Sequence, residues 1–339
     1  MPQKNVGFSI PVTDDRPLLD LRFAGQVPDI LALAQNVGLF EYLSHQSATI
    51  QEIADHFQVA PRAAEAVMAV AAAAGFLECT DHRRFGLTEL SRTYLLPASP
   101  FFRKLSPSHE RTYEDLKEAF HSDEPIKPLA VTMDVKTEDE IRSFIESMHT
   151  LTLPAAGGLA RQEIFTRIRH LLDVAGGSGS LVSAIADHNP NIRCTLLDFD
   201  AVCAIARKNI ASFGLEDRIT TFSANMFHDP WPSGHDAILF GNIFHDWDVD
   251  ACKTLAQRAY DALEPGGHIL LHEMPLNETK DGPLTVACFS IAMLLYEKGK
   301  QYTLSEFESI LTEAGFTEFQ SVPSYGYYHL VCAKKQCKT

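Results

Sequence analysis

The chain has 339 residues, 45% of them apolar and 22% charged, which is enough for two domains with a sizeable core. A formal net charge of −15 argues against nucleic acid or an anionic membrane as the main partner, because phosphate binding depends on a basic surface. No run of roughly 18 apolar residues occurs, and residues 1–15 lack a long apolar core. We therefore expect neither a membrane span nor a signal peptide, and we expect a cytoplasmic protein. The seven cysteines form no CxxC pair and are odd in number, which argues against a zinc ribbon or a disulfide framework.

Residues 1–100 predict a small, mainly helical domain. Residues 1 to about 20 show little periodicity, and we expect an extension that packs against a partner subunit. Apolar residues then recur at helical spacing over 31–43 and 49–57, and Thr49 with Glu52 has the spacing of a capping box. Pro61 and Gly75 bound a further helix, and two short apolar runs flank the polar turn 81–84 as in a hairpin. Helices followed by a hairpin predict a winged-helix outline.

A winged helix can bind DNA, and this alternative has to be weighed. The helix that begins at Pro61 presents alanine, methionine and valine, with only Arg62 basic near its start. It lacks a face that could bind phosphates. A packing and dimerisation module is therefore the favoured interpretation of this domain.

Residues 101–164 predict a helical linker. Residues 107–120 have a helical pattern, 124–134 predict a loop, and 138–164 predict one long helix. From residue 165 to 339, apolar runs alternate with helical segments, at 170–175, 192–199, 218–224, 235–242 and 268–274, with two more runs at 318–324 and 327–334. Such alternation predicts an α/β fold, a doubly wound Rossmann-like parallel sheet covered on both faces.

A glycine-rich turn follows the first of these strands in the run DVAGGSG, residues 173–179. Gly176, Gly177 and Gly179 allow the backbone to approach a ligand closely, and the next helix directs free N–H groups toward it. Asp198 ends the second strand about 20 residues later, where an acid can accept hydrogen bonds from a ribose diol. The run contains neither GxxxxGK[ST] nor GxGxxG, so the turn predicts a nucleotide-type ligand without a triphosphate or pyrophosphate cradle.

The motifs DVAGGSG, FHDWD and LEPGGHILLHEMPL together resemble the small-molecule O-methyltransferase family that uses S-adenosylmethionine, with caffeate, hydroxyindole and bacterial natural-product members. The resemblance covers essentially the whole chain. It implies a seven-stranded sheet of order 3-2-1-4-5-7-6, a homodimer formed through the N-terminal domain, a linker helix that lines the acceptor pocket, and a role in secondary metabolism. Ala175 stands where the family's DxGGGxG has glycine, and an alanine can serve there if its φ is negative.

The resemblance also implies which residues hold the cofactor. The turn from Ala175 to Gly179 would hold its methionine portion, Asp198 its ribose hydroxyls, and Phe199 its adenine, and Asp173 ends its strand at the same edge of the sheet, where the ligand could also touch it. Asn225 and Met226 would contact the base, although many relatives have aspartate at the first of these positions. Glycine stands at 241, where plant relatives commonly have lysine, so Asn242 is expected to take over part of that polar contact.

His245 is the candidate catalytic base, because the fourth strand delivers it beside the expected cofactor pocket and its ordinary pKa is roughly 6.5. Glu273 ends the adjacent strand, where it can orient the imidazole and stabilise its cation. In the family the matching residues are the general base and a flanking glutamate. Gln301 stands at the family's second flanking glutamate, where an amide can fix the ring but favours the imidazolium less. Asp246 and Trp247 are expected to be structural, at a helix start and packed beneath it.

Acceptor-lining residues can be predicted only by segment, and each is as consistent with ordinary helix core. The candidates lie on the linker helix and on the helix that precedes the KGKQYT run: Met148, Leu151 and Leu153, then Phe289, Met293, Leu294 and Tyr296. The predicted function is methyl transfer to a hydroxyl of a small, aromatic metabolite. Two alternatives remain open: C-methylation of an activated carbon or a metal-assisted variant in which His245 is a ligand, and a non-catalytic cofactor-binding regulator.

Overall fold

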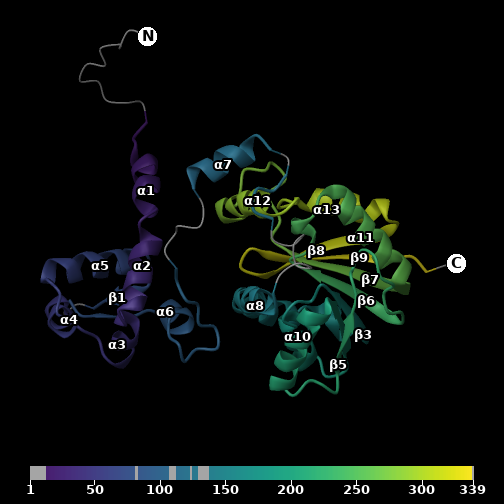
Figure 1. Cartoon of the computed structure of the whole chain (residues 1–339), viewed down its shortest axis with the longest axis horizontal. Coiled ribbons are helices and arrows are strands. Elements are labelled where there is room, and N and C mark those ends of the chain that lie inside the picture. Colours follow the sequence, from purple (N-terminus) through teal and green to yellow (C-terminus); the bar gives the residue numbers. More distant parts are fainter. Residues whose placement is uncertain (1–12, 81–82, 107–111, 123, 129–136, 338–339) are drawn as a thin grey trace, which may run out of the picture. The chain divides into compact units, whose positions relative to one another are not determined.

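The computed structural model describes residues 13–80, 83–106, 112–122, 124–128 and 137–337. The chain forms two compact units, residues 1–111 and 112–339 (Figure 1). The expected extension before residue 13, the tip of the predicted hairpin at 81–82, the start of the helix predicted at 107–120 and most of the loop predicted at 124–134 lie outside the described residues.

The first unit consists of helices and one short hairpin: α1 (Arg16–Ala24), α2 (Val27–Asn36), α3 (Leu39–His45), α4 (Ile50–Phe57), α5 (Pro61–Ala73), β1 (Leu77–Cys79), β2 (Phe85–Leu87) and α6 (Glu89–Tyr94). Helix α1 begins at Arg16, within the extension expected to residue 20, and the packing of that extension against a partner subunit stays a prediction. The apolar pattern over 31–43 spans two helices, since Gly38 adopts φ +84° between them.

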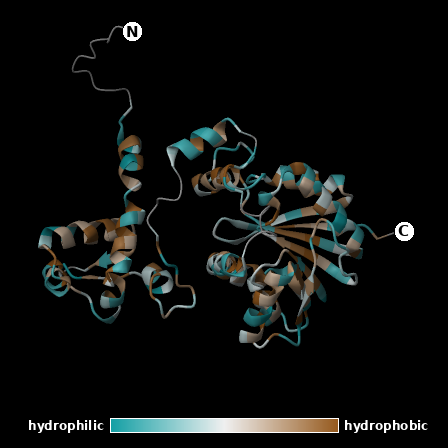
Figure 2. Ribbon diagram, viewed as in Figure 1, coloured by the Kyte–Doolittle hydropathy of each residue, from teal (hydrophilic) through white to brown (hydrophobic). Residues whose placement is uncertain are grey.

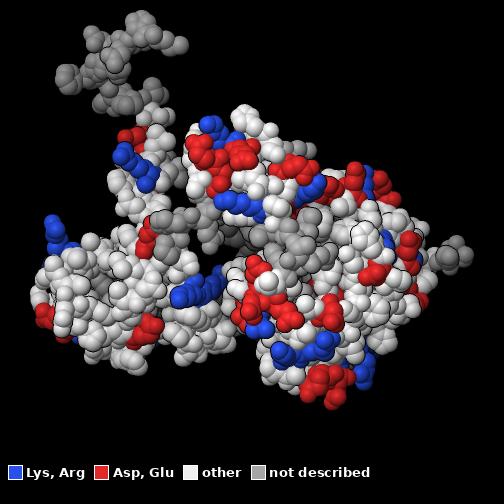
Figure 3. Space-filling model, in the orientation of Figure 1, with Lys and Arg blue, Asp and Glu red and all other residues white. Residues whose placement is uncertain are grey.

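The predicted capping box at the start of α4 is confirmed. Thr49 Oγ1 accepts a hydrogen bond from the backbone N–H of Glu52 at 3.2 Å, and Glu52 Oε2 accepts one from the N–H of Thr49 at 2.8 Å. The face of this unit seen in Figure 3 is mostly uncharged and carries no continuous basic stripe. On this visible side, the described residues of the unit form no continuous basic face of the kind that binds phosphates.

The second unit begins with α7 (Tyr113–Phe120) and the long α8 (Glu138–Ala160) and continues as a three-layered α/β fold. Its remaining elements are the 3-10 helix η2 (Glu163–Thr166), β3 (His170–Val174), α9 (Ser180–His188), β4 (Arg193–Asp198), α10 (Asp200–Ser212), β5 (Ile219–Ser223), β6 (His235–Gly241), η3 (Phe244–Asp246), α11 (Val249–Ala262), β7 (Leu263–Glu273), α12 (Leu284–Tyr296), α13 (Leu304–Glu313), β8 (Phe316–Tyr325) and β9 (Tyr328–Lys335).

The sheet has the order β5-β4-β3-β6-β7-β9-β8. Counted from β3 as the first strand, this is 3-2-1-4-5-7-6, so the implied topology is confirmed. The first five strands pair in parallel, and β9 runs antiparallel to both of its neighbours. Helices α11 and α13 cover one face, and α8, α9 and α10 cover the other (Figure 1).

Burial on both faces explains why the central strands are continuous apolar runs. Phe240 packs toward the α11 and α13 layer, whereas its neighbour Leu239 packs toward α8 and α9. Figure 2 shows these strands as a hydrophobic band between helices with hydrophilic outer faces. Among the described residues, no helix combines the length and apolar composition that crossing a membrane requires.

The topology also fixes where a ligand can bind. From β3 the chain adds β4 and β5 on one side, and from β6 it adds β7 on the other. The loops that follow β3 and β6 therefore diverge, and a crevice opens beyond the carboxyl ends of these strands.

Candidate active site

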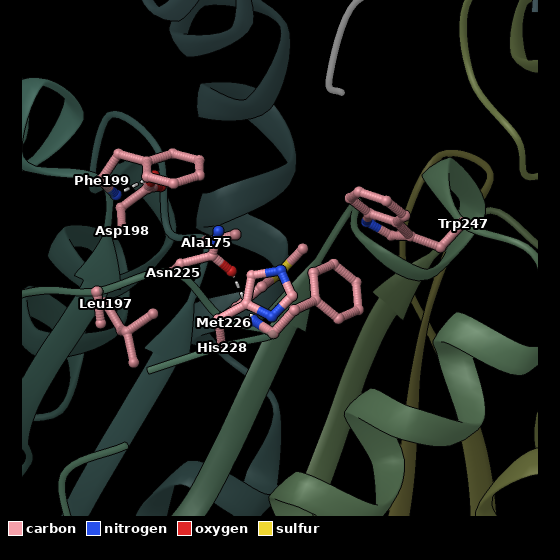
Figure 4. Close-up of a pocket in the computed structure, with 10 residues that line it drawn as sticks. Ala175, Leu197, Asp198, Phe199, Asn225, Met226, His228 and Trp247 are labelled. Carbon is pink, nitrogen blue, oxygen red and sulfur yellow. Dashed lines mark hydrogen bonds between the residues drawn. The ribbon is translucent and has the colours of Figure 1, made fainter. Parts of the chain in front are cut away.

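A cavity of about 250 Å³ lies at this edge of the sheet. It is lined by Ala175, Leu197, Asp198, Phe199, Ala224, Asn225, Met226, Phe227, His228 and Trp247 (Figure 4). Five of these were predicted as cofactor-binding residues: Ala175, Asp198, Phe199, Asn225 and Met226. Trp247, expected only to pack beneath a helix, also lines the cavity, on the side opposite Phe199 in Figure 4. His228 was missed, because nothing in the sequence distinguishes it from an ordinary loop histidine.

The glycine turn departs from expectation at Ala175, which has φ +55° rather than a negative value. Its N–H donates to the carbonyl of Leu197 at 2.7 Å, which helps to hold this conformation. Gly177 and Gly179 also have positive φ, +56° and +77°. Gly176 is needed for a different reason, since a Cβ there would lie 2.6 Å from Oδ2 of Asp173. Three positions of the turn are thus left-handed, and one of them is occupied by a residue that disfavours this region.

Two backbone N–H groups hold the carboxylate of Asp198 at the end of β4. Its Oδ2 accepts from the N–H of Gly177 at 2.9 Å, and its Oδ1 accepts from the N–H of Phe199 at 2.8 Å. Burial raises the pKa of Asp198 to about 6, although the two backbone donors lower it. The carboxylate retains free lone pairs at the cavity, as a group that binds two hydroxyls requires.

Asp173 lies beneath the turn and is only 1% exposed. Neither carboxyl oxygen has a hydrogen-bond partner among the described residues. Burial and then the neighbouring charge of Asp198 raise the pKa of Asp173 well above its ordinary value. An unpaired buried carboxyl group is costly, and a bound cation or N–H donor would relieve that cost.

The opposite end of the cavity is shaped by the loop after β5. Asn225 Oδ1 accepts from the N–H of Phe227 at 2.8 Å, so the oxygen expected to face an adenine amino group already has a partner. Its Nδ2 remains as a donor. The carbonyl of Met226 accepts from Nε1 of Trp231 at 3.0 Å, which fixes the turn that carries Met226.

Helix α8 is fastened to the glycine turn by a contact that the sequence did not reveal. Nδ1 of His149 lies 2.7 Å from Oγ of Ser180 and 3.2 Å from Oγ of Ser178. The carbonyl of Ser178 in turn accepts from Nδ2 of Asn209 at 3.1 Å. His149 neighbours Met148, but only the tertiary packing of α8 on α9 shows that it faces the turn.

His245 and Glu273 form a buried pair at the ends of β6 and β7. Nδ1 of His245 lies 2.6 Å from Oε2 of Glu273, and the two residues are 4% and 0% exposed. Oε1 of Glu273 accepts from the backbone N–H groups of Ile243 and Phe244 at 3.0 and 2.9 Å. The carboxylate is thus held from both sides and fixes the imidazole ring.

Asp246 faces the other imidazole nitrogen, with its Oδ1 3.3 Å from Nε2 of His245. The expectation that Asp246 starts the following helix was wrong: Asp248 caps α11 by accepting from the N–H of Ala251 at 2.9 Å. Burial alone would lower the pKa of His245, but the charges of Glu273 and Asp246 outweigh burial and hold that pKa well above its ordinary value.

Gln301, predicted to flank the imidazole, makes no hydrogen bond to it. Its side chain is buried, and its Nε2 has no partner among the described residues. Asn242 does not line the cofactor cavity, and its buried Oδ1 is likewise unpaired within the described part of the chain. A Cβ at position 241 would overlap Cδ1 of Leu181, so a larger residue there requires the Leu181 side chain to move.

Of the predicted acceptor-lining residues, the structure brings Phe289 to the catalytic pair. Its ring centroid lies 5.3 Å from that of His245, in an edge-to-face arrangement. Met293, one helical turn along α12, is also buried. Met148 and Leu151 are partly exposed on α8, and the roles of these residues and of Tyr296 stay predictions. Within the described ranges, no three His, Cys, Asp or Glu side chains are grouped to share a metal ion.

The sheet order, the left-handed turn after β3 and the largely apolar cavity with Asp198 at the switch point are those of a Rossmann-like methyltransferase. A family model of the O-methyltransferase domain matches residues 115–317, and one of the O-methyltransferase dimerisation domain matches residues 19–97. The chain belongs to the O-methyltransferase family and is an S-adenosylmethionine-dependent enzyme.

Individual relatives agree with this assignment. The chain is 33% identical over 303 residues to a 3-hydroxy-5-methyl-1-naphthoate 3-O-methyltransferase of Streptomyces sahachiroi, covering 86% of each chain. It is 27% identical over 329 residues to acetylserotonin O-methyltransferase of Bos taurus, covering 91% of this chain and 94% of the relative. The crystal structure of human N-acetylserotonin methyltransferase with S-adenosylmethionine superposes with a TM-score of 0.78 at 23% identity, covering 96% of this chain and 100% of the other.

The residues present at the cavity suit S-adenosylmethionine. The unpaired carboxyl group of Asp173 lies beneath the glycine turn and is not part of the cavity lining, so its contact with the cofactor stays a prediction. Asp198 offers acceptor oxygens for ribose hydroxyls, and Phe199 and Trp247 offer flat apolar surfaces for a base.

Replacing Ala175 with glycine should stabilise the protein. The change removes the strain of an alanine at φ +55°, and the greater freedom of glycine in the unfolded chain offsets only part of the gain. We expect the free energy of unfolding to increase by about 0.5–1 kcal/mol in denaturant titrations. Ala224→Gly is the control, because Ala224 lines the same cavity without a positive φ and should lose stability. A loss of stability in Ala175→Gly would contradict the strained conformation.

Cofactor affinity should depend on pH through Asp198. As pH falls through about 6, the carboxylate takes up a proton and loses acceptor capacity, so calorimetry should show S-adenosylhomocysteine binding about tenfold more weakly at pH 5 than at pH 7.5. Asp198→Asn should bind weakly at both pH values. The same titration on Asp173→Asn separates the contribution of the second carboxyl group. Equal wild-type affinity at both pH values would exclude an ionised Asp198 as the ribose ligand.

Proposed function

We propose that the enzyme methylates a hydroxyl of a small aromatic metabolite and that His245 is the base that removes the hydroxyl proton. The observation that carries this proposal is the buried His245–Glu273 pair beside the cofactor cavity. By their names, the relatives act on a hydroxynaphthoate and on acetylserotonin, both aromatic. The apolar ring of Phe289 against the imidazole supports a flat acceptor at this place.

The pair assigns separate tasks to the two imidazole nitrogens. With the Nδ1 proton donated to Glu273, Nε2 is the nitrogen that accepts the acceptor's proton, once the hydroxyl takes the place of Asp246, whose Oδ1 lies 3.3 Å from Nε2. The charge of Glu273 then stabilises the imidazolium, and its two backbone donors keep the carboxylate in place. When bound, S-adenosylmethionine supplies the electrophilic methyl group.

We also propose that the enzyme is a homodimer formed through its N-terminal unit. Helix α1 has no buried residue, although Leu21 and Phe23 are large and apolar, with exposed fractions of 67% and 58%. Apolar surface of this kind is stabilised when another chain covers it. The match to the dimerisation domain begins at residue 19, within this helix.

Removing the imidazole should abolish most of the activity without loss of cofactor. We expect His245→Ala to lower kcat for transfer of labelled methyl to a phenol by about 10²–10³-fold. The affinity for S-adenosylhomocysteine should remain within about threefold, because His245 does not line the cofactor cavity. His188→Ala is the control, since His188 is exposed on α9. Retention of full activity by His245→Ala would refute the base assignment. NMR of the methylated product separately shows whether oxygen or carbon receives the methyl group.

The pH profile provides a further readout of the same pair. Transfer requires the neutral imidazole, and the carboxylates of Glu273 and Asp246 outweigh burial to raise its pKa. Activity should therefore still be rising with pH above neutrality. Glu273→Gln removes one of these charges, so it should shift the rise toward lower pH while reducing the maximal rate. An unchanged profile in Glu273→Gln would show that His245 does not control the rate.

The dimer is tested by mass in solution. Wild type should sediment at twice the 37.6 kDa of the chain, and Leu21→Glu should shift it toward the monomer by placing a charge in the apolar contact. Asp20→Ala, an exposed polar change on the same helix, should leave the mass unchanged. A dimer that survives Leu21→Glu at micromolar concentration would indicate that α1 is not part of the interface.

A further inference from the structure

Gln301 carries a buried hydrogen-bond donor that the protein leaves unused. The residue is 1% exposed, and its Nε2 has no partner among the described residues. Native proteins pair nearly all buried polar groups, and each exception needs an explanation. A donor left free within a binding region is explained by an acceptor atom that a ligand supplies.

Residues on both sides of Gln301 in the sequence pack against the turn that carries His245. A Cβ at Gly299 would overlap the carbonyl oxygen of His245 and lie 2.5 Å from the backbone nitrogen of Trp247. The hydroxyl of Tyr302 donates to the carbonyl of Trp247 at 2.7 Å. Gln301 stands between these two contacts, so its backbone runs directly along the turn that carries His245.

The backbone of Gln301 is tied to the helix that contacts the imidazole. The N–H of Gln301 donates to Oγ of Ser290 at 2.9 Å. The residue before Ser290 is Phe289, whose ring meets the His245 ring at a centroid distance of 5.3 Å. Two independent sets of contacts therefore place Gln301 beside the catalytic residue.

The amide does not serve to orient the imidazole. Nδ1 of His245 is occupied by Glu273 and Nε2 faces Asp246, so both nitrogens already have carboxylate neighbours. We propose, resting on the function proposed above, that Nε2 of Gln301 donates a hydrogen bond to an oxygen of the methyl acceptor. The enzyme thereby selects hydroxyaromatic acceptors that carry a carbonyl oxygen close to the hydroxyl.

The chemistry of the side chain makes this choice specific. A glutamate at this position would present only acceptor oxygens and would repel a carbonyl oxygen, whereas the amide presents a donor. A carbonyl group conjugated with the ring also makes the hydroxyl more acidic. A meta carbonyl that satisfies Gln301 therefore also eases the proton transfer to His245, whereas an ortho carbonyl holds the hydroxyl proton in an internal hydrogen bond.

The test uses two pairs of probes that differ only in the carbonyl group: 2-hydroxyacetophenone with 2-ethylphenol, and 3-hydroxyacetophenone with 3-ethylphenol. Binding to the protein with S-adenosylhomocysteine is measured by calorimetry. For at least one pair, wild type should bind the ketone about tenfold more tightly than its ethyl partner, and Gln301→Leu should erase that difference. Gln301→Glu, of equal size, should weaken the ketone further. In turnover, Gln301→Leu should raise KM for the ketone and leave kcat nearly unchanged.

Gln257→Leu, an exposed change on α11, is the control and should preserve the discrimination. Equal wild-type affinity within both pairs would overturn the proposal. A Gln301→Leu variant that weakens the binding of ketone and ethyl probes equally would also overturn it, because that result would mean that the Gln301 amide has only a structural role. Since binding is measured without turnover, discrimination in a protein that methylates neither probe would refute the proposed function and leave the role of Gln301 standing.

Discussion

The buried carboxylate of Glu273 is the constraint on which the rest of the site depends. It ends β7, yet its partners belong to the segment after β6, where it accepts two backbone N–H groups and the imidazole proton of His245. A charge in a fully buried position survives only with such a complete set of donors. The same contacts that make the charge tolerable therefore determine the path of the chain after β6 and the orientation of the catalytic ring.

The fold was largely predictable from local patterns. Continuous apolar runs predicted the strands of the parallel sheet, and the capping box at Thr49 and Glu52 marked the start of a helix. The errors arose where one residue changed the local geometry. Gly38 divides an apolar pattern into two helices. Helix α1 was not predicted, and none of its residues is buried against the rest of the described chain.

The candidate site was predictable to the extent that its residues end strands. Asp198 ends β4, Phe199 follows it, and both line the cavity. Glu273 ends β7 beside His245. Strand order and direction decide these placements. Loop and tertiary contacts were not predictable. The positive φ of Ala175 and the contact of Asp246 with the imidazole depend on backbone paths that no residue spacing encodes.

The contact of His149 with the two serines beside the glycine turn has a structural consequence. Helix α8 carries the predicted acceptor-lining residues Met148 and Leu151, and His149 fastens it to Ser178 and Ser180. The contact joins the glycine turn directly to a helix, with no loop between them. The side chain that touches the cofactor turn and the side chains predicted to line the acceptor pocket therefore belong to one helix and are adjacent in the sequence.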